Sequence, residues 1–360
     1  MELIKNFNME LIKNVISGPC AHYQAWPDLV RTRTGKLLCA FSACTHHCDR
    51  SFTQIMLCES LDDGASWSTP RGVSDACGIA RTSYYYNNAA LSQLADGRIA
   101  LVYDRIDGND ENLAPSHVMH SFSQDDGATW SEAIMTPAEG IVPDKLLELS
   151  SGRWLQGCHR YDPSSRLLVQ RLWYSDDRGA SWQGPVVVAA ASGLNLCEGS
   201  ILEVEPGLLV CFMRENSGTG LPCYRAISHD NGLTWEGPHA FPIPCCHRPK
   251  AGLLADGNIA ITYRLFQGGA SSAQNTFLAL TDAKSILEPD YRQCRSRLMP
   301  LDHDEAEFPD TGYTGWVQLP TGNLFIVNYI KDHAENAWIC GYRFDLNGFT
   351  QFHSIWHDRA

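Results

Sequence analysis

Three polar side chains stand at the start of apolar, strand-like runs, where a hydrophobic core would have no use for them. They are Glu198 before SILEV, Arg248 in HRPKAGLL and Tyr313 in GYTGWVQL. Arg214 follows Glu198 by 16 residues. A guanidinium group binds a carboxylate through two parallel hydrogen bonds, so two arginines that converge on one site would indicate an acidic ligand.

Histidines lie close to these segments. His47 precedes Asp49 by two residues, and His247 adjoins Arg248. An imidazole exchanges a proton near neutral pH and could assist chemistry at the same site, whereas a partly buried, hydrogen-bonded ring is the structural alternative.

The elements that must position these residues are visible as repeats. The motif Ser-x-Asp-x-Gly-x-x-Trp occurs four times, at residues 60–67, 123–130, 175–182 and 228–235. Its aspartate can bind backbone N–H groups two residues on, and its glycine can adopt the positive φ of a tight turn. Each copy therefore predicts a hairpin closed by a tryptophan.

A second repeat consists of a glycine turn between two apolar runs. The turns are centred on Gly35, Gly97, Gly152, Gly207, Gly257 and Gly322, 50 to 65 residues apart. Six units of about four strands predict an all-β fold, a six-bladed β-propeller with four-stranded antiparallel blades. Polar residues that open the inner strands would then meet at the mouth of the axis.

Composition excludes several classes of function. The net charge is −13, with 28 Lys+Arg against 41 Asp+Glu, and no basic cluster is present, which argues against nucleic-acid partners. No uncharged apolar stretch reaches the roughly 18 residues of a membrane span.

The amino-terminal residues are expected to lie outside the fold. Glu2, Lys5, Glu10 and Lys13 interrupt any signal-peptide core, which predicts a cytoplasmic protein. Because MELIKN occurs twice there, we assign residues 1–19 to an extension and residues 20–360 to a single domain.

Fourteen cysteines are scattered through apolar runs and are expected to be reduced core thiols. The loop CTHHC at residues 44–48 could supply two metal ligands, but no CxxC pair accompanies it. We therefore predict no metal and no cofactor.

The four boxes on six blade-sized repeats resemble the sialidase (neuraminidase) superfamily over essentially the whole chain. In known sialidases a tyrosine nucleophile is paired with a glutamate, an aspartate is the acid/base, and three arginines hold the substrate carboxylate. The resemblance implies that Tyr313 is the nucleophile and Glu198 its base. A neutral phenol suits this role, because the carboxylate beside the anomeric carbon repels an anionic nucleophile.

The resemblance also implies the remaining roles. Arg214 and Arg248 would clamp the carboxylate, with Arg264 in ITYR as a spare. His47 and His247 are expected to contact the substrate because of their positions beside these segments. Asp49, the carboxylate in the middle of the stretch between the first hairpin and the first box, would be the acid/base. The implied activity is a retaining exo-glycosidase that removes a terminal α-linked sialic acid or related acidic sugar from a glycan.

Structural interpretations exist for the same residues. Arg214 could form a structural ion pair, Glu198 could be a buried strand carboxylate, Tyr313 a packed aromatic and Asp49 an exposed turn residue.

One segment departs from the family. Ala25-Trp26-Pro27 stands where the family has Arg-Ile-Pro, and alanine cannot bind a carboxylate. Three other functions therefore stay open. A propeller-fold polysaccharide lyase would remove a uronate proton with Tyr or His. Another glycosidase would act on uronate-containing glycans, and a non-catalytic propeller would bind acidic glycans without consuming them. The presence of Tyr, Glu and two Arg at separate blade openings favours an enzyme.

Overall fold

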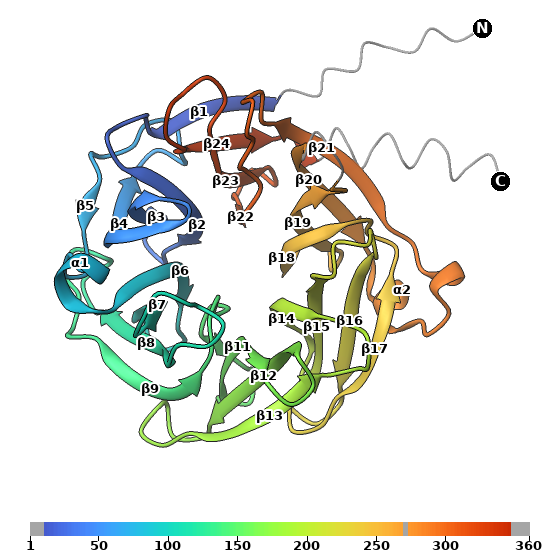
Figure 1. The fold of residues 1–360 in the computed structure, drawn as a ribbon. Helices are drawn as coiled ribbons and strands as arrows, with labels where there is room; N and C mark the ends of the chain where they lie inside the picture. Colours follow the sequence, from blue (N-terminus) through green and yellow to red (C-terminus); the bar gives the residue numbers. More distant parts are fainter. Residues whose placement is uncertain (1–10, 269–272, 347–360) are drawn as a thin grey trace, which may run out of the picture.

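The computed structural model describes residues 11–268 and 273–346, which form a six-bladed β-propeller around a central axis (Figure 1). Each blade is a four-stranded antiparallel sheet, so the fold predicted from the repeats is confirmed. In the described part of the chain, no helix has the length and apolar character needed to cross a bilayer.

Blades I to V each use four strands that follow one another in the sequence. Blade I contains β2 (Tyr23–Arg31), β3 (Leu37–His46), β4 (Asp49–Ser60) and β5 (Arg71–Gly72), and blade II contains β6 (Tyr85–Gln93), β7 (Ile99–Ile106), β8 (Ser116–Ser123) and β9 (Ile134–Glu139). Blade III contains β10 (Leu147–Glu148), β11 (Trp154–Asp162), β12 (Leu167–Ser175) and β13 (Gln183–Ala189), and blade IV contains β14 (Leu196–Glu205), β15 (Leu208–Glu215), β16 (Cys223–Ser228) and β17 (Glu236–Phe241). Blade V contains β18 (Cys246–Leu253), β19 (Ile259–Phe266), β20 (Gln274–Thr281) and β21 (Arg297–His303). Two connections between strands contain short helices. The β5–β6 connection contains α1 (Ile79–Thr82), and the β20–β21 connection contains α2 (Ala283–Leu287) and the 3-10 helix η1 (Tyr291–Gln293).

Blade VI joins the two ends of the described chain. It contains β22 (Thr314–Gln318), β23 (Leu324–Ile330), β24 (Trp338–Phe344) and, as its outer strand, β1 (Leu11–Ser17). Residues 11–17 were expected to lie outside the domain, but they pair with β24 and close the ring. Most of β1 faces solvent, because it is the outer edge strand of its blade. An exposed edge strand needs few apolar residues, so its sequence lacks a clear strand pattern.

The four Asp boxes form the predicted hairpins, each between the third and fourth strand of a blade. In the first box, Ser60 Oγ accepts a 2.9 Å bond from the Gly64 N–H and donates to Asp62 Oδ1 at 2.8 Å. Asp62 Oδ1 in turn accepts from the Ser66 N–H at 2.8 Å. Antiparallel strands place these boxes on the face opposite the start of the inner strands, so they support the scaffold and not the mouth.

The inner strands carry a shared distortion at the mouth. One residue with positive φ occurs at the same place in each blade: Trp26, Asn88, Val142, Glu198, Arg248 and Gly312. In blades I, II, IV and V the pairing register shifts there, as in a β-bulge. A bulge re-aims a side chain, and strained non-glycine positions of this kind cluster at functional sites. Two of the predicted site residues, Glu198 and Arg248, occupy this position.

The second strands supply a matching set of polar residues. In blades I to V, one residue of the second strand pairs with the position just before the distortion. In blade order these residues are Ser42, Asp104, His159, Arg214 and Arg264. Arg214 and Arg264 are thus equivalent positions of neighbouring blades, a relation that sequence spacing alone did not indicate.

All fourteen cysteines are free, and eleven of them are buried in the core, as expected for thiols that pack as small hydrophobes.

Candidate active site

A tyrosine, a glutamate and an arginine meet at the mouth of the axis. The Tyr313 hydroxyl donates a 2.5 Å hydrogen bond to Glu198 Oε1, and Arg214 Nη1 lies 2.8 Å from the same oxygen. Arg214 Nη1 also donates to the Tyr313 oxygen at 3.0 Å. Tyr313 directly precedes β22, whereas Glu198 and Arg214 belong to β14 and β15. The ring of blades therefore joins three residues predicted from the sequence.

The surroundings of this group favour a proton on Tyr313 over one on Glu198. Burial opposes ionisation of Glu198, but the charge of Arg214 and the hydrogen bond from Tyr313 hold the Glu198 pKa at about 2. Burial and the nearby Glu198 carboxylate raise the pKa of Tyr313 above its usual value. Near neutral pH, a protonated phenol thus donates to an ionised carboxylate, as a Tyr nucleophile and its base require.

Arg264 packs against the ring of the same tyrosine. Its guanidinium carbon is 4.5 Å from the centre of the Tyr313 ring. Arg264 Nη1 donates to Gln274 Oε1 at 3.0 Å and forms an ion pair with Asp310 at 3.4 Å. Arg214 and Arg264, the latter expected only as a spare, therefore both contact Tyr313, Arg214 at the hydroxyl and Arg264 at the ring.

Arg248 has a different environment. Its backbone N–H donates to Glu198 Oε2 at 3.0 Å, but its guanidinium donates to the carbonyl oxygens of Val142 and Pro143 at 3.2 and 3.0 Å. The side chain is buried and links blade V to the segment that precedes blade III. With its guanidinium group engaged by backbone oxygens, Arg248 is better suited to hold the floor of the mouth together than to bind a substrate carboxylate.

The two buried histidines at the mouth are neutral. His159 Nδ1 accepts from the Glu198 N–H at 3.2 Å, and burial lowers the His159 pKa to about 4. His247 lies 3.5 Å from Arg264 Nη2, and burial and the neighbouring arginines lower its pKa to about 2. His247, predicted to contact the substrate, lies next to the Arg264 guanidinium group and helps to hold it in place.

These histidines predict a loss of stability in mild acid. His120, which bonds Gln156 at 2.8 Å in blade II, also has its pKa lowered to about 4 by burial. Between the unfolded pKa near 6.5 and these folded values, the unfolded chain binds protons that the native state does not. Each such histidine lowers the free energy of unfolding by about 1.4 kcal/mol per pH unit as pH falls. Asp104 acts in the opposite direction, because burial raises its pKa to about 7, but it offsets only one histidine.

We expect His120→Gln, which keeps an N–H donor near Gln156, to reduce the stability lost between pH 6.5 and pH 4.5. Denaturant titrations at both pH values test this expectation. Equal losses in the wild type and the variant would contradict it.

A buried carboxylate that sequence analysis did not select organises the other half of the mouth. Asp310 accepts hydrogen bonds from the hydroxyls of Tyr23 and Tyr329, the latter at 2.6 Å, and contacts His47 Nδ1. Burial opposes its ionisation, but His47 and Arg264 hold the Asp310 pKa at about 2. Its place three residues before Tyr313, in PDTGYTG, was the available signal.

Asp49, predicted to be the acid/base, is directed to its own turn. Its carboxylate accepts from the Ser51 N–H at 2.8 Å and the Ser51 hydroxyl at 2.6 Å, and these bonds lower its pKa.

In the same loop, Cys44 is buried and Cys48 is exposed. Across residues 11–268 and 273–346, no group of three His, Cys, Asp or Glu is arranged to hold a metal ion.

Ala25, which replaces the first family arginine, is fully buried. The next residue, Trp26, packs its ring 5.3 Å from the ring of His47. The guanidinium of Arg50 lies 4.8 Å from the Trp26 ring, and Arg50 Nη1 donates to the carbonyl oxygens of His46 and His47. Blade I thus presents a tryptophan, a histidine and an arginine where an arginine was expected on the strand.

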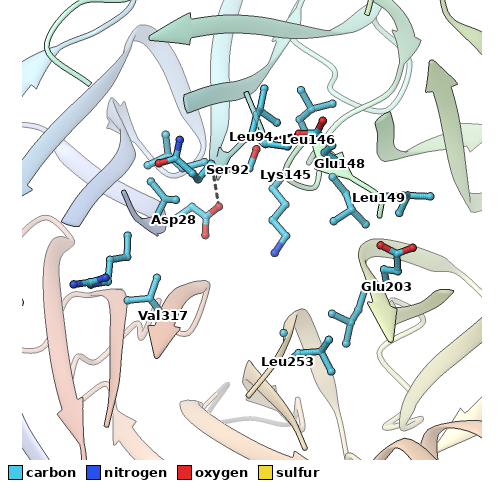
Figure 2. A pocket seen from close by; sticks show the side chains of 18 of the residues that line it. Asp28, Ser92, Leu94, Lys145, Leu146, Glu148, Leu149, Glu203, Leu253 and Val317 are labelled. Atoms are coloured by element: carbon cyan, nitrogen blue, oxygen red, sulfur yellow. Dashed lines mark hydrogen bonds between the residues drawn. The ribbon is translucent and has the colours of Figure 1, made fainter. Parts of the chain in front are cut away.

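A separate cavity of about 1020 Å³ opens along the axis on the opposite face. Figure 2 shows Lys145 pointing into it, with Asp28 and Glu203 on its walls. Lys250, which also lines it, forms ion pairs with Asp28 at 3.1 Å and Asp144 at 3.4 Å. The Tyr313–Glu198 pair does not line this cavity, so the mouth is the candidate active site.

Comparisons with known proteins agree with this architecture. The sequence pattern of the BNR repeat-like domain family matches residues 35–273. A protein named sialidase from Bacteroides fragilis (strain YCH46) is 31% identical over 150 residues, which cover 38% of this chain and 26% of that protein. The chain thus matches only about a quarter of the length of this curated relative.

Solved structures share the fold at low identity. A protein of unknown function from Dyadobacter fermentans DSM 18053 superposes with a TM-score of 0.76 at 20% identity, covering 93% of this chain and 99% of that one. The intramolecular trans-sialidase from Ruminococcus gnavus superposes with a TM-score of 0.65 at 14% identity, covering 93% and 98%.

Proposed function

We propose that this chain, which belongs to the BNR repeat-like family of sialidase-like β-propellers, is a retaining glycosidase that removes a terminal sialic acid or related acidic sugar from glycans. The observation that carries the proposal is the contact of Tyr313, Glu198 and Arg214 at the mouth of the axis. The B. fragilis relative named sialidase supports the substrate class.

In the proposed reaction the substrate carboxylate lies against Arg214 and Arg264. Both guanidinium groups contact Tyr313, so a carboxylate held there brings the adjacent anomeric carbon to the phenol oxygen. The phenol attacks this carbon while its proton passes to Glu198, the bond from the anomeric carbon to the leaving oxygen breaks, and a covalent glycosyl-tyrosine forms as the rest of the glycan departs. Water then releases the sugar with retained configuration.

Substrate binding would also activate the base. In the free enzyme, the charge of Arg214 keeps Glu198 weakly basic. A substrate carboxylate paired with Arg214 compensates that charge, which raises the proton affinity of Glu198 when the phenol proton must leave. Proton transfer is thereby coupled to occupation of the site by an acidic sugar.

The test is to incubate the protein with an aryl α-sialoside and, separately, with uronate-terminated oligosaccharides. We expect release of the phenol from the sialoside and no near-ultraviolet absorbance of an unsaturated product from the uronates. Unsaturated product from a uronate, with no phenol release, would replace hydrolysis by elimination. Binding of either ligand without turnover would replace the enzyme by a glycan-binding propeller.

A further inference from the structure

We propose that His47, held by Asp310, is the acid/base residue of this site and takes the role that the family resemblance assigns to Asp49. The inference rests on the proposed glycosidase function. It combines three observations: where His47 lies, how its ring is oriented, and which partners engage four neighbouring carboxylates.

His47 lies at the tip of the β3–β4 hairpin, above the mouth. Its side chain is 40% exposed, and its ring packs edge-on against Trp26 at 5.3 Å. The hairpin tip is fixed because Arg50 Nη1 donates to the carbonyl oxygens of His46 and His47. The imidazole is therefore partly open to solvent and to a ligand at the mouth, while its backbone is held in place.

The ring orientation is set by a carboxylate that stays ionised. His47 Nδ1 contacts Asp310, which is buried and also bound by Tyr23, Tyr329 and Arg264. A carboxylate at Nδ1 keeps the proton on that nitrogen and leaves Nε2 to exchange a proton with the substrate, as in Asp–His pairs of hydrolases. Asp310 therefore positions the ring, and His47 Nε2 is the reactive atom.

Four carboxylates near the mouth are less suited to the task. Asp49 bonds the backbone and hydroxyl of Ser51, and Asp310 is enclosed by its four partners. Glu198 is engaged with Tyr313 and Arg214. Asp104 has an unpartnered Oδ1 but is fully buried and cannot meet a glycosidic oxygen.

The proposed steps balance. In the first, the Tyr313 oxygen bonds to the anomeric carbon, the bond to the leaving oxygen breaks, the phenol proton passes to Glu198, and the Nε2 proton of His47 passes to the leaving oxygen. In the second, His47 accepts a proton from water, the water oxygen bonds to the anomeric carbon, and the Tyr313 oxygen departs and recovers its proton from Glu198. No electron donor or acceptor is needed.

Leaving-group dependence distinguishes this role from a structural one. We expect His47→Ala to lower kcat/KM about 100-fold or more on a sialyl-lactose, whose leaving oxygen needs a proton, since general acid catalysis contributes 10²–10⁴-fold. On 4-nitrophenyl α-sialoside, whose phenolate leaves without a proton, the loss should stay below about tenfold. Azide, which needs no base, should restore the second step and yield a glycosyl azide. Asp310→Asn should show the same trend more weakly.

Asp49→Ala is the matched control, from the same hairpin, and is expected to keep both activities. Equal losses of both activities in His47→Ala would assign His47 a structural role and overturn the inference. A leaving-group-dependent loss in Asp49→Ala, with none in His47→Ala, would also overturn it. A wild-type protein that cleaves neither sialoside would instead contradict the proposed function, so the two failures are distinguishable.

Discussion

Replacing Tyr313 with Phe is expected to lower kcat/KM for an aryl α-sialoside by at least about 1000-fold, because the variant lacks the oxygen that would attack the anomeric carbon. The fold should survive, since Glu198 keeps its 2.8 Å contact with Arg214 and only the two hydrogen bonds of the hydroxyl, each worth about 1 kcal/mol, are lost. Steady-state kinetics and a thermal melt of the same preparation test both expectations.

Glu198→Gln should produce a loss of similar size, because the amide cannot accept the phenol proton. The double variant Tyr313→Phe/Glu198→Gln should lose little more than either single variant, since residues that act as one unit are not additive. Glu203→Gln is the matched control. Glu203 lies on the same strand, but its carboxylate accepts from Ser150 and Gly207 in the hairpins of the opposite face. Activity above about a tenth of the wild type in either single variant would contradict the nucleophile assignment.

The second large effect concerns stability. Lys250 is almost fully buried and forms ion pairs with Asp28 and Asp144. Asp28 also accepts from the Leu91 N–H at 2.9 Å and Asp144 from the Ile201 N–H at 2.8 Å, so each carboxylate ties its own segment to the next blade. Removing the lysine would leave two buried carboxylates without this cation.

We expect Lys250→Met to lower the free energy of unfolding by about 3 to 5 kcal/mol, as when one partner of a buried ion pair is removed. The triple variant Lys250→Met/Asp28→Asn/Asp144→Asn should recover part of this loss, because the amides can still accept the two backbone bonds without an uncompensated charge. Equilibrium denaturation measures both values.

Lys36→Met provides the comparison for Lys250. Lys36 pairs with Glu59 at 3.2 Å and with Asp126 at 3.8 Å, and both carboxylates are more exposed than those around Lys250, so its loss should cost less than about 1 kcal/mol. Equal effects of Lys36→Met and Lys250→Met on the free energy of unfolding would contradict this expectation. The buried ion pairs of Lys250 would then contribute no more to stability than the more exposed pairs of Lys36.

The sequence by itself determined the architecture of this protein. The Asp boxes and glycine turns are local signals, because a turn depends on a few neighbouring residues, and their period is enough to predict six four-stranded blades. Polarity that conflicts with the adjacent apolar strands selected Glu198, Arg248 and Tyr313, and the family resemblance added Arg214. The outer strand β1 was not recognised, because an exposed edge strand leaves only a weak pattern.

Only the tertiary structure decided which of these residues meet. Tyr313 and Glu198 are 115 positions apart, and His47 and Asp310 are 263 apart, so their contacts exist only once the ring has closed. Arg248 and Arg264 belong to the same blade, and the family resemblance favoured Arg248 for the clamp. The bulge at Arg248 and the register that pairs Arg264 with His247 instead bring Arg264 against the Tyr313 ring. Register and bulges depend on packing between strands, and no local sequence signal records them.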